Sequence, residues 1–184
     1  VTGEPFGLKA GASCVAEYAV PRDEWYFEAN RCEIMPFAVL LEIALQPCGW
    51  LAAYCGSALT SPVDLSFRNL GGTATQLRPV TRDTGLLTTR VKLTSVSTSA
   101  GMIIQHYDLR VSASAGDVYT GTTYFGFFTK DALANQVGMP SAKVPFPSAA
   151  EEARAERTEL PHGAPFPAPM LRMVDQIPVY VPDG

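Results

Sequence analysis

The chain has 184 residues, of which 47% are hydrophobic and 17% are charged, and its formal net charge is −4. This length suits one domain of ordinary size with appendages, and the composition is that of a globular rather than a disordered protein. The acidic balance argues against a nucleic-acid-binding protein, because such proteins usually carry an excess of basic residues.

The beginning of the chain shows no secretory signal peptide, because VTGEPFGLKAG has neither a basic start nor a long apolar run. A first residue Val1 instead of Met suggests a fragment of a longer polypeptide. Residues 11–20 are apolar and β-prone and are closed by Pro21, so they predict a strand. We expect the aromatic segment WYFEANRCEI that follows to be irregular.

A long apolar helix is predicted to begin near Met35-Pro36 and to end around Cys55-Gly56, since proline suits a first helical turn. The stretch is long enough to cross a membrane. Glu42, Gln46 and Pro47 near its middle argue against a span. We therefore expect a helix of a soluble fold that is buried on nearly every side.

Glu42 is the only charged residue between Ile34 and Val63, and Gln46 falls on the same helical face one turn later. A lone carboxylate in an apolar helix loses hydration, so it must be neutralised, paired or used in chemistry. Buried hydrogen bonds or protonation without any chemistry remain an alternative for Glu42. Pro47 predicts a kink or break near residues 43–46, where Gln46 would either cap the break or pair with Glu42.

Downstream the hydrophobic period changes to two, which is typical of strands with one polar face. Turn signals at Gly71-Gly72, Asp83-Thr84-Gly85, Ala100-Gly101 and residues 115–117 separate the segments LSFRNL, TATQLRPV, LLTTRVKLTSVSTS, MIIQHYDLRVSAS and DVYTGTTYFGFFTK. Short turns favour an antiparallel sheet. The fold class is therefore α+β, with a curved antiparallel sheet wrapped around the long helix.

The first domain is expected to cover residues 1–138, with a short helix over 131–138 at its end. Residues 139–165 are rich in Pro, Ala and Glu and predict a linker that contains an exposed helix in AAEEARAERTEL. Residues 166–184 become apolar again but are too short to fold alone.

Four cysteines without a C-x-x-C pair and two histidines make a metal site unexpected. We interpret Cys14, Cys32, Cys48 and Cys55 as small buried thiols in a reducing compartment, and expect a cytoplasmic protein. His106 is expected on the polar face of a strand, and His162 in the linker. Trp25, Tyr26 and Phe27 are expected as core aromatics or as the lining of an acyl tunnel.

The order of strand, aromatic loop, Met-Pro, long helix and antiparallel strands resembles the hot-dog fold. It more specifically resembles 3-hydroxyacyl-ACP dehydratases of the 3-hydroxydecanoyl type, whose motif runs W-F-F, catalytic His, M-P-G, then an acidic residue and Gln four apart. The matching residues are 25–27, 35–37, and Glu42 with Gln46. The stretches MPFAVLLEIALQPCGWLAAYCGSALTS and DLSFRNLGGTATQ further resemble the dehydratase region of polyunsaturated fatty acid synthases, which are multidomain enzymes of polyketide-synthase type.

The resemblance implies dehydration of a 3-hydroxyacyl chain carried on the phosphopantetheine of an acyl carrier protein, with no metal or redox cofactor. It implies that Glu42 is the catalytic acid and that Gln46 supports it. Met35, Pro36 and Phe37 would bind substrate at the start of the helix. FPAPMLRMVDQI is similar to the opening of another hot-dog unit, so residues 166–184 would begin a second one.

The chain departs from the family motif at the catalytic histidine. Counting from Trp25 places that position at Asn30, and counting back from Met35-Pro36 places it at Glu28. Asn cannot serve as a general base near neutral pH. We therefore expect a composite site whose histidine comes from a partner hot-dog, in tandem or in a homodimer. The alternatives are a non-catalytic hot-dog that supports a catalytic neighbour, and a hot-dog thioesterase.

Overall fold

The computed structural model of the chain describes residues 1–29, 32–136, 147–159 and 176–180. The chain divides into two units, Val1–Gln136 and Val137–Gly184. The domain boundaries expected after residues 138 and 165 both lie outside the described residues and stay predictions.

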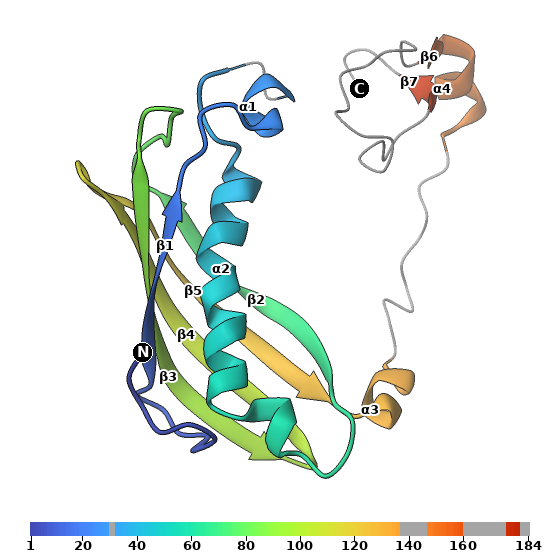
Figure 1. Cartoon of the computed structure of the whole chain (residues 1–184). Helices are drawn as coiled ribbons and strands as arrows, with labels where there is room; N and C mark the ends of the chain where they lie inside the picture. Colours follow the sequence, from blue (N-terminus) through green and yellow to red (C-terminus); the bar gives the residue numbers. More distant parts are fainter. Residues whose placement is uncertain (30–31, 137–146, 160–175, 181–184) are drawn as a thin grey trace. The chain divides into compact units, whose positions relative to one another are not determined.

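The first unit contains the predicted antiparallel sheet (Figure 1). Its five strands have the order β1-β3-β4-β5-β2. They are β1 (Ser13–Ala19), β2 (Ser66–Gln76), β3 (Leu86–Ser99), β4 (Met102–Ala113) and β5 (Gly116–Phe128). The long strands β3 and β4 alternate between buried and more exposed residues, so one face of the sheet is apolar and the other is polar. Strand β5 also buries consecutive residues, at 118–119 and 125–127.

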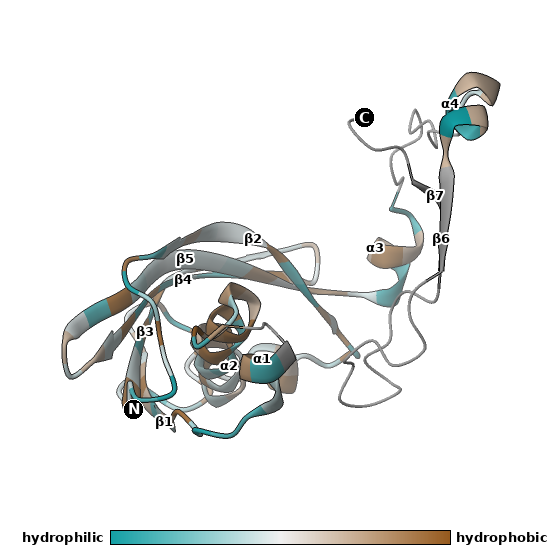
Figure 2. Cartoon of the chain, turned by 90° about the horizontal axis from the view of Figure 1, so that it is seen from above, coloured by the Kyte–Doolittle hydropathy of each residue, from teal (hydrophilic) through white to brown (hydrophobic). Residues whose placement is uncertain are grey.

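Helix α2 (Phe37–Tyr54) packs on the apolar face, and the curved sheet wraps around one side of it (Figure 2). Its fully buried residues recur every three or four positions, as expected of a helix with one face against a sheet. They are Leu40, Ala44, Cys48 and Leu51. A short 3-10 helix, η1 (Ser57–Thr60), follows α2, and α3 (Lys130–Ala134) follows β5. The α+β class and the wrapped helix are thus confirmed.

The expectation that α2 is buried on nearly every side is wrong for the single chain. The sheet covers one side only, and the opposite side carries exposed Trp50 together with Glu42 and Gln46. By length and composition Phe37–Thr60 could cross a membrane, but the core helix of a soluble protein passes the same test. Residues of α2 belong to the hydrophobic core of the first unit, as expected of a core helix.

The expected break near residues 43–46 is also wrong, because α2 is one helix that continues through Pro47. Proline removes a single backbone donor. Pro47 and its neighbour Cys48 are both buried against the rest of the unit, and this packing holds the helix together across the missing bond.

Gly71 and Gly72 do not form the predicted turn; they lie within β2, at a bulge between Asn69 and Gly71. Their φ values are 147° and 159°, which suit glycine. A Cβ on Gly72 would lie 2.0 Å from the Thr122 carbonyl oxygen. The glycines therefore allow the close approach of β2 to β5, which the sequence pattern cannot distinguish from a turn.

The aromatic segment before α2 is not irregular throughout, because Trp25–Ala29 form the short helix α1. In the second unit, the predicted exposed helix AAEEARAERTEL forms only in its first half, as α4 (Ala149–Arg154), which a capping box between Ser148 and Glu151 begins; residues 156–159 form a strand instead. Strands β6 (Glu156–Glu159) and β7 (Gln176–Tyr180) pair antiparallel.

Candidate functional site

Glu42 and Gln46 form a side-chain pair on the open side of α2. The Gln46 amide Nε2 donates to a carboxylate oxygen of Glu42. The spacing of four residues brings the two together on one helical face, as predicted. Both side chains are exposed, so the expectation of a dehydrated carboxylate is wrong in the single chain. From the sequence, Gln46 is expected either to cap a helix break or to pair with Glu42. In the structure it pairs with Glu42.

A cavity of about 600 Å³ lies beside this pair, between α2, α1 and β1. Its lining is mostly apolar and comes from all three elements and one residue of β3. The lining residues are Ala16, Glu17, Tyr18, Trp25, Tyr26, Ala38, Val39, Glu42, Ile43, Gln46, Pro47 and Thr89. A neighbouring hollow of about 520 Å³ shares Ala16, Gln46 and Pro47 and continues to Trp50. Together they form a groove along α2 in which an apolar chain could lie beside one carboxylate.

The end of the cavity away from Trp50 has an aromatic wall with two hydroxyl groups. Tyr26 is 4% exposed, and its hydroxyl lies 3.3 Å from that of Tyr18 on β1. Burial, and then the hydrogen bond with Tyr18, raise the pKa of Tyr26 above its usual range, so its hydroxyl stays protonated at neutral pH. Trp25 packs edge-on against Tyr26 with ring centroids 5.9 Å apart.

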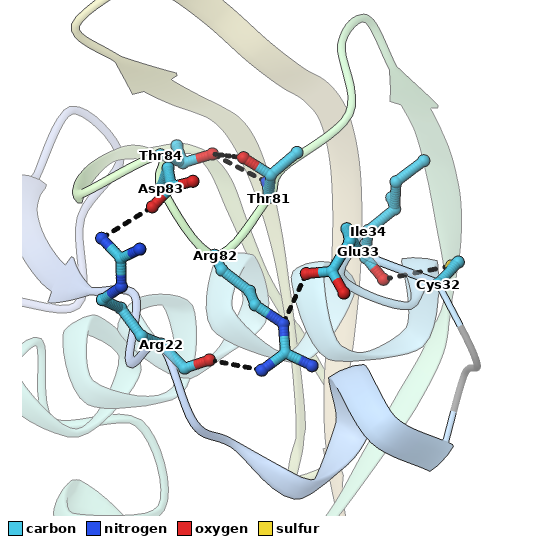
Figure 3. A network of polar contacts seen from close by, with 8 residues as sticks. All are labelled: Arg22, Cys32, Glu33, Ile34, Thr81, Arg82, Asp83 and Thr84. Atoms are coloured by element: carbon cyan, nitrogen blue, oxygen red, sulfur yellow. Dashed lines mark hydrogen bonds and ion pairs between the residues drawn. The ribbon is translucent and has the colours of Figure 1, made fainter.

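Arg82 connects the segments that carry this wall (Figure 3). Its Nη1 donates to the backbone carbonyl of Arg22 over 2.8 Å, and its Nε lies 2.6 Å from the Glu33 carboxylate. Its guanidinium lies 4.9 Å from the centroid of the Phe27 ring in α1. The Met35 amide also donates to the Val80 carbonyl over 2.7 Å, so the approach to α2 is fastened beside Arg82.

The residues predicted to bind substrate lie at the start of α2 but do not line the cavity. Met35 is 1% exposed and belongs to the core, whereas Pro36 is the N-cap of α2 without a side-chain cap. Phe37 is 41% exposed and packs against Tyr119 on β5. Ala38 and Val39 line the cavity instead.

Asn30, the predicted vacant histidine position, lies outside the described residues, and so does His162. Glu28 is exposed on α1 and does not line the cavity. His106 lies exposed on β4 as expected, where it stacks on Tyr124 with centroids 5.0 Å apart. Among the lining residues of the cavity there is no histidine.

Three of the four thiols are buried as predicted, namely Cys14, Cys48 and Cys55, whereas Cys32 is exposed. Burial raises the pKa of Cys48 to about 12 and also raises the pKa values of Cys14 and Cys55. These thiols are therefore poor nucleophiles. Within the described part of the chain, no three His, Cys, Asp or Glu side chains are arranged to hold a metal ion.

Sequence reasoning missed Tyr18, Glu17 and Thr89 as lining residues, because they come from β1 and β3 and share no motif with α2. A possible signal was Tyr26, which stands where the resembled motif has a phenylalanine and so adds a hydroxyl. A second hollow of about 640 Å³ lies on the opposite face of the sheet and is lined by Arg90, Lys92 and Arg110 among threonines. It contains none of the predicted site residues.

Comparisons with known proteins agree with this architecture. No protein-family model matches the chain. The fluoroacetyl-CoA thioesterase FlK is similar in structure with a TM-score of 0.54 and 13% identity, covering 70% of this chain and 93% of that one. S. sahachiroi AziG has a TM-score of 0.50 and 14% identity over 63% and 83% of the two chains. A hot-dog-like protein from Thermanaerovibrio acidaminovorans has a TM-score of 0.49 and 15% identity over 73% and 94%.

With its long helix wrapped by an antiparallel sheet, the first unit is a hot-dog domain. Its sequence relates it further to a polyunsaturated fatty acid synthase polypeptide of a Thraustochytrium species, with 31% identity over 132 residues. The matching region covers 70% of this chain and 9% of that polypeptide. The chain is thus a homologue of one segment of a much longer synthase polypeptide.

Proposed function

We propose that this hot-dog domain supplies Glu42 as the acid of a dehydratase site that acts on 3-hydroxyacyl thioesters bound to an acyl carrier protein. The observation that supports the proposal most is the Glu42–Gln46 pair beside an apolar groove on the open side of α2. The relationship to a polyunsaturated fatty acid synthase supplies the context, since such a synthase elongates acyl chains.

The reaction requires a base, an acid and a donor for the thioester carbonyl. The base removes a proton from Cα, and the electron pair of that C–H bond forms the Cα–Cβ double bond. The C–O bond at Cβ breaks, and Glu42 protonates the departing hydroxyl so that water leaves. Gln46 donates a hydrogen bond to the resulting Glu42 carboxylate and holds it in place beside the groove. No step requires a metal or redox cofactor.

The base would come from a second hot-dog, because no histidine lines the cavity among the described residues. The exposed side of α2 supports this arrangement. Trp50 on this side is 55% exposed and the adjoining groove has a mostly apolar lining, so a second surface would cover apolar area there. A partner on this side would close the groove over Glu42, remove water from it and strengthen its electrostatic interactions.

Two other functions remain as alternatives. A hydrolase is favoured by the similarity in fold to FlK, which is a fluoroacetyl-CoA thioesterase, and a carboxylate beside an apolar groove suits that reaction too. The missing histidine favours a non-catalytic hot-dog that supports a catalytic neighbour. The three functions differ in their products, which makes them separable.

The test is to incubate the full-length protein with a 3-hydroxyacyl thioester of the carrier protein and to analyse the products by mass spectrometry. Dehydration predicts an acyl chain lighter by one water and still attached to its carrier. Release of the free hydroxy acid with a free thiol would instead establish a thioesterase. An unchanged substrate would leave the supporting role.

A further inference from the structure

Tyr18 and Tyr26 line the Glu42 cavity, as do the polar residues Glu17 and Thr89, and the roles above leave the tyrosine pair unused. Each tyrosine hydroxyl carries one proton and can also accept hydrogen bonds. The 3.3 Å contact between the two hydroxyls uses only one of these two protons. Neither hydroxyl has another hydrogen-bond partner among the described residues, so one donor remains available.

This available donor lies in an environment where it matters. Either hydroxyl can be the donor within the pair. Tyr26 is 4% exposed and Tyr18 is half-buried, and a hydroxyl proton without an acceptor in such surroundings is unfavourable by comparison with one that is paired. The surrounding lining is mainly apolar, with Ala38, Val39 and Ile43 from α2 across the cavity. An oxygen atom of a bound ligand would therefore satisfy the donor, whereas a purely apolar ligand would not.

We propose that the Tyr18–Tyr26 pair donates a hydrogen bond to an oxygen atom of the acyl thioester that occupies the Glu42 cavity, either the 3-hydroxyl or the thioester carbonyl. This inference rests on the proposed function for the choice of ligand. The pair and Glu42 approach the ligand from different elements, β1 and α1 on one side and α2 on the other. They fix its orientation along the groove, with the apolar tail directed toward Trp50.

The test compares wild-type full-length protein with Tyr18→Phe, Tyr26→Phe and the double variant, all of which keep the rings. Either single variant leaves one hydroxyl proton free to donate, so only the double variant removes the donor. The probes are a 3-hydroxyacyl pantetheine amide and the same amide without the 3-hydroxyl. The amides replace the thioester because their less acidic α-proton slows elimination. Calorimetry should show that the double variant weakens binding of the hydroxylated probe about threefold to tenfold, the change expected for one neutral hydrogen bond.

The second probe identifies the oxygen atom. An effect confined to the hydroxylated probe assigns the 3-hydroxyl, and an equal effect on both probes assigns the carbonyl. The matched control is Tyr124→Phe, because Tyr124 stacks on His106 and does not line the cavity. Wild-type affinity in the double variant, or no binding of either probe to the wild-type protein, would overturn the inference.

The outcomes also separate this inference from the proposed function. Tyrosine-dependent binding without any dehydration would uphold the hydrogen bond and contradict the dehydratase proposal. Dehydration with unchanged affinity in the double tyrosine variant would uphold the dehydratase proposal and contradict the hydrogen bond. Circular dichroism of each variant establishes that the sheet and α2 are intact.

Discussion

Glu42 shows at the scale of one residue what a sequence reveals about a site and what it leaves open. Its pairing with Gln46 could be predicted, since residues four apart on a helix are neighbours whatever the rest of the fold does. Its exposure could not, because it depends on how far the sheet curves around α2. Burial is set by tertiary contacts, and spacing along one helix carries no information about them.

The cysteines provide a prediction at the same scale. Burial keeps Cys48 in the thiol form, with a pKa of about 12, whereas Cys32 is exposed. Because the thiolate is the reactive form, iodoacetamide at pH 8 should modify Cys32 in the native protein and spare Cys14, Cys48 and Cys55. Peptide mass spectrometry measures the modified sites.

Modification of all four cysteines in urea is the control for this experiment. Rapid native modification of Cys48 would contradict its placement in the core.

The pKa of Cys48 in the folded state lies above its unfolded value. Its contribution to stability is therefore fully present below about pH 9 and falls as the pH rises toward 12.

At the scale of elements, Arg82 shows why the aromatic wall could not be derived from the sequence. Its guanidinium contacts the Arg22 carbonyl, 60 residues away, together with the Phe27 ring and the Glu33 carboxylate. No periodicity links positions so far apart. The strands and α2 were predictable because period and composition are local, whereas the approach of α1 to α2 is fixed by this long-range contact. The sequence predicts a turn at Gly71 and Gly72 in error, because glycine is typical both of turns and of places where two backbones approach closely, as at the bulge in β2.

Arg82→Ala should destabilise α1 and the segment before α2 locally, while the sheet stays folded. We expect a loss of about 1–3 kcal/mol in unfolding free energy from the hydrogen bond and the ring contact. The Glu33 ion pair adds little, because the Glu33 side chain is 74% exposed. Hydrogen exchange should accelerate over residues 25–29 and 33–36 but not over β3–β5.

The matched variant for Arg82 is Arg82→Lys, which keeps the charge but not the planar, forked donor group. It should recover part of the lost protection. If Arg82→Ala left exchange over residues 25–29 at the wild-type rate, the fastening role assigned to Arg82 would be wrong.

At the scale of the whole molecule, the first unit is a sheet with one covering helix whose outer side stays open. Glu42, Gln46 and Trp50 lie on that side, so the groove they share is open to solvent in the single chain. The hot-dog fold could be predicted from the order of elements and the central motif. The shape of the groove could not, because it is formed where β1, α1 and α2 meet.

The open side of α2 leads to a prediction about assembly. Trp50 is 55% exposed and stacks on Tyr54, so Trp50→Lys should change the unfolding free energy by no more than about 0.5 kcal/mol. It should nevertheless weaken association with the partner hot-dog, because it places a charge in an apolar contact. Analytical ultracentrifugation measures the association.

Lys130→Ala on α3 serves as the control for Trp50→Lys, because it changes charge away from this surface. Unchanged association in Trp50→Lys, with folding intact, would show that the partner does not cover this side of α2.

The central claim is that Glu42 is the acid of a dehydratase site, and the most direct test is the turnover number of Glu42→Gln in the full-length protein. This substitution keeps the size of the side chain and removes the ionisable proton. We expect kcat for dehydration of a 3-hydroxyacyl carrier-protein thioester to fall by about 10²- to 10⁴-fold, with the unfolding midpoint unchanged. A wild-type kcat in folded Glu42→Gln would contradict the assignment.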